Sequence, residues 1–530
     1  MLPLCGFALA VGARVLTFQV VETFLDGPQN FLSGITDIKV LPVGEGLRIY
    51  TATRPGGGVL SLDVGARIKL GDIEALPSGI GVPAPARLDL LTLGGAQTLL
   101  VTGGNAARLA GFRIDDSGMI GVPTQVGGSP QGAISALAHV TLGTDTYCYT
   151  ARLGDSGITA SRLLGNGKME EVAHLPLGAD WQGVDVTDLV AVLLGDQTYV
   201  MALSVRQNAL LSFRLDADGG LTAAGSLGTA GGLGIAAPAA IEMVRVGGVD
   251  YALVAGAGSS SISVVGVGTG GVLSLADHVV DSLDTRFQGV QALASVTLGD
   301  RVFVLAGGGD DGVNVFALLP GGRMLLLGSV LQEPGRALDN ITAISAVPWG
   351  GGIEVFVAGE GAGITRLHLD PGLLAPTLVG GAGADLLRGD DRGDLLSGGA
   401  GNDTLYGAAG RDILMDGAGA DVMTGGSGAD HFVLARDGAS DRITDFEPGV
   451  DRLDLTAWGR VYDISALDIA VTATGAVIRF GAETLVIESA DGGPIGCDSF
   501  TSADLFTLWH VVADPVIAGL RVEEIGRAHV

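Results

Sequence analysis

Six consecutive nine-residue units, which begin at Gly380 and end at Val433, constrain the fold of this chain more than any other sequence feature. They read GGAGADLLR, GDDRGDLLS, GGAGNDTLY, GAAGRDILM, DGAGADVMT and GGSGADHFV. In every unit the sixth residue is aspartate and the eighth is large and apolar. Because glycine tolerates positive φ, the first six residues can turn tightly, and the last three then form a short strand. The pattern predicts a parallel β-roll in which two units make one coil.

Units two apart stack on the same side of such a roll, which places their aspartates above one another. Stacked carboxylates repel unless a cation lies between them, and hard oxygen ligands at this density suit Ca²⁺. The four stacked pairs allow up to four ions between coils. The predicted ligands are six aspartates and eight turn carbonyls, namely Asp385, Asp394, Asp403, Asp412, Asp421 and Asp430 with the carbonyls of Gly381, Gly383, Gly399, Gly401, Gly417, Gly419, Gly426 and Gly428.

Two departures from the repeat affect this prediction locally. Arg392 stands where glycine is usual, so the ion between Asp394 and Asp412 is expected to be the least secure. Ala408 also replaces a glycine. A glycine-rich linker or a metal-free solenoid is the alternative, which the unbroken register of the six units disfavours.

The units resemble the calcium-binding repeats of RTX, or hemolysin-type, proteins. The run DRITDFEPGVDRLDLTAW from Asp441 resembles the cap that follows the roll in serralysin-type proteins. This resemblance implies that Asp441 and Asp445 ligate or cap the last coil, with a structural turn as the alternative. The run DSFTSADLF from Asp498 resembles the region near the end of substrates that a Gram-negative type I secretion transporter reads. The serralysin protease domain is absent, so the resemblance carries no protease activity.

The first 370 residues contain a second repeat with a period near 50 residues. Short β-rich runs with turn signals between them predict four strands in each unit. Seven such units predict a seven-bladed β-propeller, with stacked β-sandwiches as the alternative. The last unit stops after its third strand, so the strand-like residues 15–26 are expected to close the last blade. The central apolar residues of the seven units are Ile38, Leu90, Leu137, Leu189, Met243, Leu293 and Ile344.

The blade pattern resembles lactonase-like and quinoprotein-like propellers, a likeness that alone says little about function. Four units carry an acid immediately before the central apolar residue: Asp37, Asp89, Asp188 and Glu242. The innermost strands line the channel of a propeller, so these carboxylates are weak candidates for catalysis, for binding a divalent cation or for sharing a proton. Solvation in grooves between blades is the alternative. We find no Ser/His/Asp set, which leaves enzyme activity uncertain.

Charge and composition exclude several classes of function. The net charge of −28 disfavours binding to nucleic acid or to anionic lipid. We find no apolar run that approaches the roughly 18 residues of a membrane span. The cysteines, at positions 5, 148 and 497, form no CxxC motif and predict neither a zinc site nor a disulfide scaffold. No lysine or arginine precedes the apolar residues 2–13, so a conventional N-terminal signal peptide is not expected.

These observations predict an all-β, extracellular or surface-associated RTX protein that binds calcium and folds on it outside the cell. Its propeller is expected to be a binding module for a surface or carbohydrate ligand, with a hydrolase or lactonase using the channel acids as the alternative. The last residues read EIGRAHV, which resembles a translated sequencing adapter and is interpreted as an artefact. The predicted division is propeller 1–370, linker 371–379, roll 380–433, post-roll cap and secretion region 434–523, and artefact 524–530.

Overall fold

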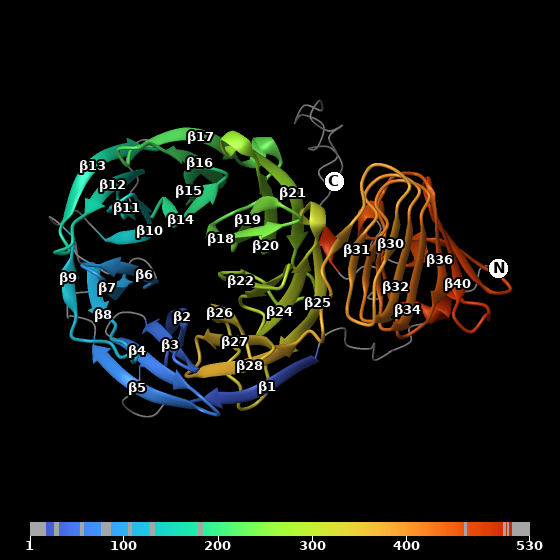
Figure 1. Ribbon diagram of the computed structural model, residues 1–530, viewed down its shortest axis with the longest axis horizontal. Coiled ribbons are helices and arrows are strands. Elements are labelled where there is room, and N and C mark those ends of the chain that lie inside the picture. Colours follow the sequence, from blue (N-terminus) through green and yellow to red (C-terminus); the bar gives the residue numbers. More distant parts are fainter. Residues whose placement is uncertain are drawn as a thin grey trace, which may run out of the picture.

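The described part of the chain folds into a propeller with a solenoid beside it (Figure 1). The predicted all-β class, with a seven-bladed propeller followed by a parallel β-roll and a small β-rich domain, is confirmed. The predicted artefact at 524–530 and the ends of the predicted strand at 15–26 lie outside the described residues. The computed structural model describes residues 17–510 except 26–30, 54–57, 76–85, 104–108, 128–132, 179–183, 460–463, 502–504 and 506–507.

Each blade is an antiparallel sheet, and in blades 1 to 6 its four blade strands run outward from the channel in chain order. Blades 1 to 3 consist of β2 (Ile35–Val43), β3 (Gly46–Thr53), β4 (Gly58–Val64) and β5 (Ile68–Ala75); β6 (Leu88–Leu93), β7 (Ala96–Val101), β8 (Leu109–Arg113) and β9 (Thr124–Val126); and β10 (Ile134–Leu142), β11 (Asp145–Arg152), β12 (Gly157–Leu163) and β13 (Met169–Pro176). Blades 4 and 5 consist of β14 (Val186–Leu194), β15 (Gln197–Ser204), β16 (Ala209–Leu215) and β17 (Leu221–Leu227); and β18 (Pro238–Val246), β19 (Val249–Gly256), β20 (Ser261–Val267) and β21 (Leu273–Val280).

The N-terminal and C-terminal parts of the propeller meet in blade 7. Strand β1 pairs antiparallel with β28, with Phe18 opposite Leu369, and forms the outer edge of that blade. An edge strand contributed from the other end of the repeat leaves no incomplete blade at the point of closure. Blades 6 and 7 consist of β22 (Ala292–Leu298), β23 (Arg301–Gly307), β24 (Gly312–Leu318) and β25 (Met324–Leu331); and β26 (Ile341–Trp349), β27 (Gly352–Gly359), β28 (Ile364–Asp370) and β1 (Thr17–Phe24).

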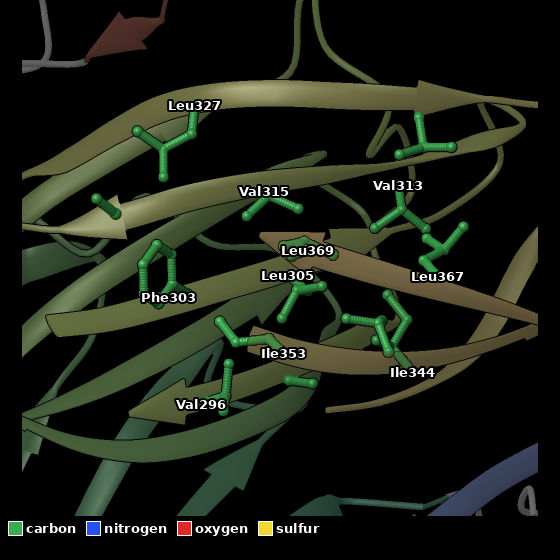
Figure 2. Packing of buried hydrophobic residues seen from close by; sticks show 14 of the residues in the cluster. Val296, Phe303, Leu305, Val313, Val315, Leu327, Ile344, Ile353, Leu367 and Leu369 are labelled. Carbon is green, nitrogen blue, oxygen red and sulfur yellow. The ribbon is translucent and has the colours of Figure 1, made fainter. Parts of the chain in front are cut away.

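Apolar contacts between adjacent blades form the propeller core. Strands β23 and β27 are buried along their whole length, because neighbouring blades cover both of their faces. Leu305 of blade 6 and Ile353 and Leu367 of blade 7 belong to one buried cluster (Figure 2). Near-continuous apolar runs in the second and third strands follow from this burial.

Hydroxyl groups on the innermost strands also connect adjacent blades. In four blades the second residue of the repeated motif is Thr or Ser, and its hydroxyl donates to a backbone carbonyl at the start of the next inner strand. The contact from blade 7 to blade 1 closes the ring. The pairs are Thr36 Oγ1 with Ala86 O at 2.6 Å, Ser135 Oγ with Val186 O at 2.9 Å, Thr187 Oγ1 with Pro238 O at 2.8 Å, and Thr342 Oγ1 with Ile35 O at 2.5 Å.

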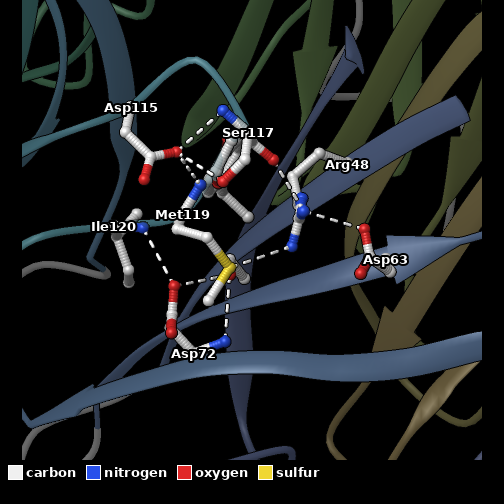
Figure 3. Close-up of polar contacts among 10 residues, drawn as sticks. Arg48, Asp63, Asp72, Asp115, Ser117, Met119 and Ile120 are labelled. Atoms are coloured by element: carbon white, nitrogen blue, oxygen red, sulfur yellow. Dashed lines mark hydrogen bonds and ion pairs between the residues drawn. The ribbon is translucent and has the colours of Figure 1, made fainter. Parts of the chain in front are cut away.

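Blades 1 and 2 are joined farther from the axis by a polar network (Figure 3). Arg48 pairs with Asp63 at 2.8 Å and donates to the Ser117 carbonyl at 2.7 Å. Asp72 Oδ2 accepts the Ile120 amide at 3.1 Å. Charged groups thus seal the contact between blades where it approaches solvent.

Two parallel sheets face one another in the solenoid, and each coil adds one strand to each sheet. The predicted inward residues stack in register, with Leu396 opposite Leu414 and Leu405 opposite Met423. The solenoid extends beyond the six units at both ends, from Leu378 to Asp454. Its strands are β29 (Leu378–Val379), β31 (Leu395–Ser397), β33 (Ile413–Met415), β35 (His431–Val433) and β37 (Arg452–Asp454) in one sheet, and β30 (Leu386–Arg388), β32 (Thr404–Gly410), β34 (Val422–Gly428) and β36 (Ser440–Phe446) in the other.

A small C-terminal sheet continues one face of the solenoid. Strand β36 pairs in parallel with β40, which carries the antiparallel strands β39 and β38. Trp458 and Phe500 are buried in the same apolar cluster as the stacked roll residues, so cap and roll share a core. The strands of this sheet are β38 (Asp468–Val471), β39 (Gly475–Phe480) and β40 (Glu483–Ser489). Strand β41 (Trp509–His510) lies apart from it, because it pairs antiparallel with β21 and adds a fifth strand to blade 5 of the propeller. The 3₁₀ turns are η1 (Thr229–Gly231), η2 (Thr269–Gly271) and η3 (Pro320–Gly322) in the propeller, and η4 (Thr456–Trp458), η5 (Ile464–Ala466) and η6 (Cys497–Ser499) after the roll.

The propeller and the roll are packed against each other by apolar and charged contacts. Leu395 and Ile413 of the roll lie in the same buried cluster as Leu327 of blade 6. Arg323 of the propeller donates to Asp454 of the roll at 3.0 Å and also to Thr456. Burial opposes ionisation of Asp454, but Arg323 and other donors outweigh it and hold the Asp454 pKa below its usual value.

We predict that Arg323→Ala destabilises the docked roll by about 3 kcal/mol, because it leaves the buried Asp454 carboxylate without its cation. Arg336→Ala removes a pair with the exposed Glu333 and is the matched control, with an expected effect below about 1 kcal/mol. Denaturant unfolding of the full chain in saturating calcium measures both effects. Equal losses in the two variants would contradict the prediction.

Candidate metal centre and axial channel

The six predicted aspartates form an ordered column on each side of the roll, which we call the aspartate ladder. In the four ladder aspartates from Asp403 to Asp430, Oδ1 accepts the backbone N–H of the aspartate one coil earlier, 18 residues back in the chain. The stacking predicted from the nine-residue spacing is therefore present. The bonds are Asp385 N to Asp403 at 2.7 Å, Asp394 N to Asp412 at 2.7 Å, Asp403 N to Asp421 at 2.6 Å, and Asp412 N to Asp430 at 3.0 Å.

The ladder continues past the last unit. Asp441 accepts the Asp421 amide at 3.0 Å, and Asp451 accepts the Asp430 amide at 3.0 Å. Asp441 had been predicted to ligate or cap the last coil, whereas Asp451 was missed. Both residues begin an Asp-x-apolar triplet. This triplet is the part of the nine-residue repeat that is still present after the last glycine-rich unit. Asp445 instead accepts the Gly425 and Gly426 amides at 3.0 and 2.7 Å, which is a backbone cap.

The surroundings of the Oδ2 atoms show whether the ladder aspartates fit a cation. Oδ2 of four ladder aspartates is buried and has no hydrogen-bond partner among the described residues: Asp403, Asp412, Asp421 and Asp430. A buried carboxylate oxygen without a donor is costly, and a cation would remove that cost. Carboxylate oxygens are also the ligands that Ca²⁺ prefers. The ladder therefore fits the predicted ion.

The turns between the strands stack too closely for side chains. Gly417 and Gly419 have φ of +97° and +130°, and a Cβ on either would collide with the carbonyl of Gly399 or Gly401 in the previous coil. Glycine is needed here both for its conformation and for its lack of a side chain. The predicted carbonyl ligands thus lie in layers one coil apart. Two of these carbonyls also accept amides, Gly381 from Ala400 at 2.8 Å and Gly399 from Ala418 at 2.9 Å.

The departures from the repeat have structural consequences. Ala408 has φ of +88°, a conformation that strains a residue with a Cβ. The Arg392 guanidinium pairs with the exposed Asp390 at 2.5 Å. A second cation, Arg301 from the propeller, is buried against this coil and donates to the Gly393 carbonyl at 3.1 Å. Burial lowers the Arg301 pKa to about 10, while Asp300 and the ladder residues Asp394 and Asp412 oppose that shift.

When no cation is bound, burial is the main influence on the pKa values of three ladder aspartates and of the two residues that continue the ladder. It raises the pKa of Asp412 to about 8 and those of Asp421 and Asp430 to about 6. Asp441 and Asp451 are raised to about 7 for the same reason. Neighbouring carboxylates add to each of these shifts. The metal-free ladder thus holds protons at a pH where ordinary aspartates have lost them.

Asp416 is a further buried carboxylate that the sequence analysis missed. It is the first residue of the fifth unit, where the other five units have glycine. Its oxygens lie with those of Asp421 and Asp441 in a group whose members are all within 4.8 Å of one another. The aspartate in a glycine position was the signal that could have identified it.

The four predicted channel acids line a cavity of about 1000 Å³ along the innermost strands. Each of these side chains also contacts a residue of the next blade. The acids therefore line the channel and lie between blades at the same time, although the two positions were predicted as alternatives. Lys39 lies in the same cavity, where Asp37 and the other acids raise its pKa against the effect of its burial. The contacts of Asp37, Asp89, Asp188 and Glu242 are, in order, Leu88 N at 2.8 Å, His139 Nδ1 at 3.0 Å, Ile241 N at 3.0 Å and Ser295 Oγ at 3.2 Å.

The ladder pKa values predict an unusual pH dependence for the metal-free roll. Raised pKa values mean that the folded state binds protons more tightly than the unfolded state, whose aspartates titrate near 4. The resulting stabilisation is complete below about pH 4 and is lost as the pH rises through about 6 to 8. We expect the roll in chelator to show a melting transition at about pH 5 that is lost as the pH rises through neutrality to about pH 8, and calcium to restore the transition at both pH values. Calorimetry of the full chain checks it, and a roll equally stable at both pH values in chelator would contradict it.

Comparisons with known proteins agree with the repeat pattern. The family model for the RTX calcium-binding nonapeptide repeat (4 copies) matches residues 379–414 and 406–437. No curated protein matches the chain. A Lactobacillus plantarum crystal structure is 18% identical, covering 57% of this chain and 86% of that one, with a TM-score of 0.42. A functionally unknown protein from Desulfotomaculum acetoxidans DSM 771 is 15% identical, covering 60% and 95%, with a TM-score of 0.38.

No helix among the described residues is long and apolar enough to cross a bilayer. The family match and the strand pairing of the blades and the roll together identify the two domains of the molecule. The chain carries RTX calcium-binding nonapeptide repeats in a β-roll, joined to a seven-bladed β-propeller.

Proposed function

We propose that this chain is a secreted protein whose roll folds when it binds calcium outside the cell, and whose propeller is a binding module. The observation that carries the first part is the set of four buried, unpartnered Oδ2 atoms in the ladder. Asp403, Asp412, Asp421 and Asp430 are nearly fully buried, so their carboxylates repel one another in a medium that screens charge poorly. Calcium would supply the missing positive charge, with the glycine carbonyls of the turns as further ligands. Metal binding and folding of the roll then become one equilibrium.

The C-terminal cap supports export of the chain before it folds. Phe500 and Leu505 belong to the segment that resembles a secretion region, and both are buried in the core shared by cap and roll. A transporter could reach these side chains only in the unfolded chain. Low calcium keeps the roll unfolded in the cytosol, and calcium outside the cell folds it after passage. RTX repeats are typical of secreted proteins, which agrees with this order of events.

We predict that the full chain loses the β-structure of the roll in chelator at neutral pH and regains it in millimolar calcium. Each site raises stability by about 2.7 kcal/mol when free calcium exceeds its dissociation constant about 100-fold. Far-UV circular dichroism and calorimetry measure the change, with the propeller transition as an internal reference. Asp403→Asn should weaken the response, whereas Asp391→Asn, at an exposed turn position outside the ladder, should not. Identical spectra in chelator and in calcium would contradict the proposal.

The cavity of the propeller supports its role as a binding module. A volume of about 1000 Å³ is large enough for a small ligand such as an oligosaccharide unit. Lys39, Arg87 and His139 line it together with the four acids, so both hydrogen-bond donors and acceptors face the space. A polar, hydroxyl-rich ligand has the groups that such a lining can bind.

The second candidate function is hydrolysis of a ligand in the channel, and the state of Glu242 is the observation that favours it. Burial raises its pKa to about 7, which suits a general acid or base, and it lies in the same cavity. Under the binding-module proposal, we predict that the wild-type chain hydrolyses gluconolactone no faster than buffer between about pH 5 and about pH 9. A calcium-dependent rate that Glu242→Gln lowers about 100-fold or more would instead establish the hydrolase. Ser295→Ala, which removes the hydroxyl bonded to Glu242 but keeps the carboxyl, is the control.

A further inference from the structure

The first position of each nine-residue unit lies beside the ladder aspartate of the same unit. A Cβ placed on Gly398 or Gly407 would collide with the carbonyl of the next coil and approach the carboxylate of Asp403 or Asp412. Glycine at this position leaves room for both groups. The fifth unit alone among the six has a side chain there, the carboxylate of Asp416.

The coil that follows the fifth unit explains how Asp416 is accommodated. Residues 434–441 read LARDGASD and no longer follow the repeat, and 20 residues rather than 18 separate Asp421 from Asp441. This coil presents the Ala435 amide to Asp416. That amide donates to both oxygens of Asp416, at 2.8 and 3.1 Å. The Asp416 carboxylate is thus held by this amide of the irregular coil and by the Gly417 amide that follows it in the chain.

The result is a group of three carboxylates at the end of the ladder. Asp416, Asp421 and Asp441 are 2%, 1% and 4% exposed, and their oxygens lie within 4.8 Å of one another. Oδ2 of Asp421 has no hydrogen-bond partner among the described residues and is nine-tenths buried or more. Arg323 of the propeller donates to Asp454 and Thr456 and also interacts electrostatically with Asp416.

We propose that Asp416, Asp421 and Asp441 form a three-carboxylate calcium site. It differs from the inner sites of the ladder, each of which lies between two aspartates one coil apart. The proposal rests on the proposed function, namely that the roll binds calcium. A third carboxylate adds negative charge to the site, and ligand charge is one of the quantities that sets calcium affinity. This site therefore binds calcium more tightly than the inner sites and is the first to fill as the calcium concentration rises.

An ion in this site would link the last coil of the roll to the C-terminal sheet. Asp441 lies on β36, which pairs with β40 of the C-terminal sheet, with Asp441 opposite Leu485. Asp416 follows β33, in the other sheet of the roll. An ion held by both residues connects the last coil to the coil before it and fixes the strand on which the cap is built.

Calcium binding by Asp416 variants of the full chain tests the site. Asp416→Gly restores the residue that the repeat has elsewhere, and Asp416→Asn keeps the shape of the side chain without its charge. We expect either variant to lose the tightest calcium class, with half-saturation of the first ion shifted about tenfold higher, while the inner sites are retained. Asp391→Asn removes an exposed charge from a turn of the same roll and should leave the isotherm unchanged. Equal isotherms for wild type and Asp416→Gly would overturn the proposal.

Anomalous diffraction from wild-type crystals grown in calcium gives a second readout that does not depend on a variant folding. The expected result is a calcium peak roughly 2.3–2.6 Å from carboxylate oxygens of Asp416, Asp421 and Asp441. Peaks between the inner aspartates but not at Asp416 would overturn this inference and leave the proposed function intact. Absence of calcium throughout the ladder would overturn the proposed function as well.

Discussion

Repulsion between carboxylates stacked one coil apart is the constraint on which the roll depends. The 18-residue coil places each ladder aspartate above another, so that in the four from Asp403 to Asp430 Oδ1 accepts a backbone amide while the buried Oδ2 has no donor among the described residues. The first interaction fixes the geometry of the coil, and the second requires a positive charge. One side chain thus has both a structural and a metal-binding role, and this combination makes folding of the roll depend on an ion. Protons can partly replace that ion, because burial raises the pKa values of Asp412 and Asp421.

The propeller solves a different problem, that of closing a ring of separate sheets. Apolar contacts hold neighbouring blades together, but the innermost strands are also joined by directed bonds from hydroxyl and carboxylate groups. Asp37 and Asp188 accept amides of the following blade, which gives a structural role to residues that sequence alone presents as candidate catalysts. Glu242 differs, because its contact across the blades is a single hydroxyl. Among the channel acids it therefore keeps the most freedom to exchange a proton or to contact a ligand.

The propeller and the roll are not independent bodies joined by a flexible linker. Residues 378 and 379 of the predicted linker already form a strand of the roll, and Leu395 and Ile413 are buried against blade 6. Arg301 and Arg323 extend from the propeller into the carboxylate-rich side of the roll. A roll that folds on calcium therefore completes an apolar and charged surface of the propeller as well as its own core.

Sequence periodicity by itself determined most of this architecture. A strict nine-residue period fixes which aspartates stack, and a period near 50 residues fixes the number of blades, because each repeat places equivalent residues in equivalent positions. The period does not predict the partner of Asp416 or the place of Asp451 in the ladder, because the coil after the fifth unit leaves the repeat and these contacts span 19 and 21 residues. Pairs such as Arg323 with Asp454, 131 residues apart, depend on how two completed domains dock. Local spacing encodes the elements that repeat, whereas only the tertiary structure decides which irregular segments meet and what charge each carries into the contact.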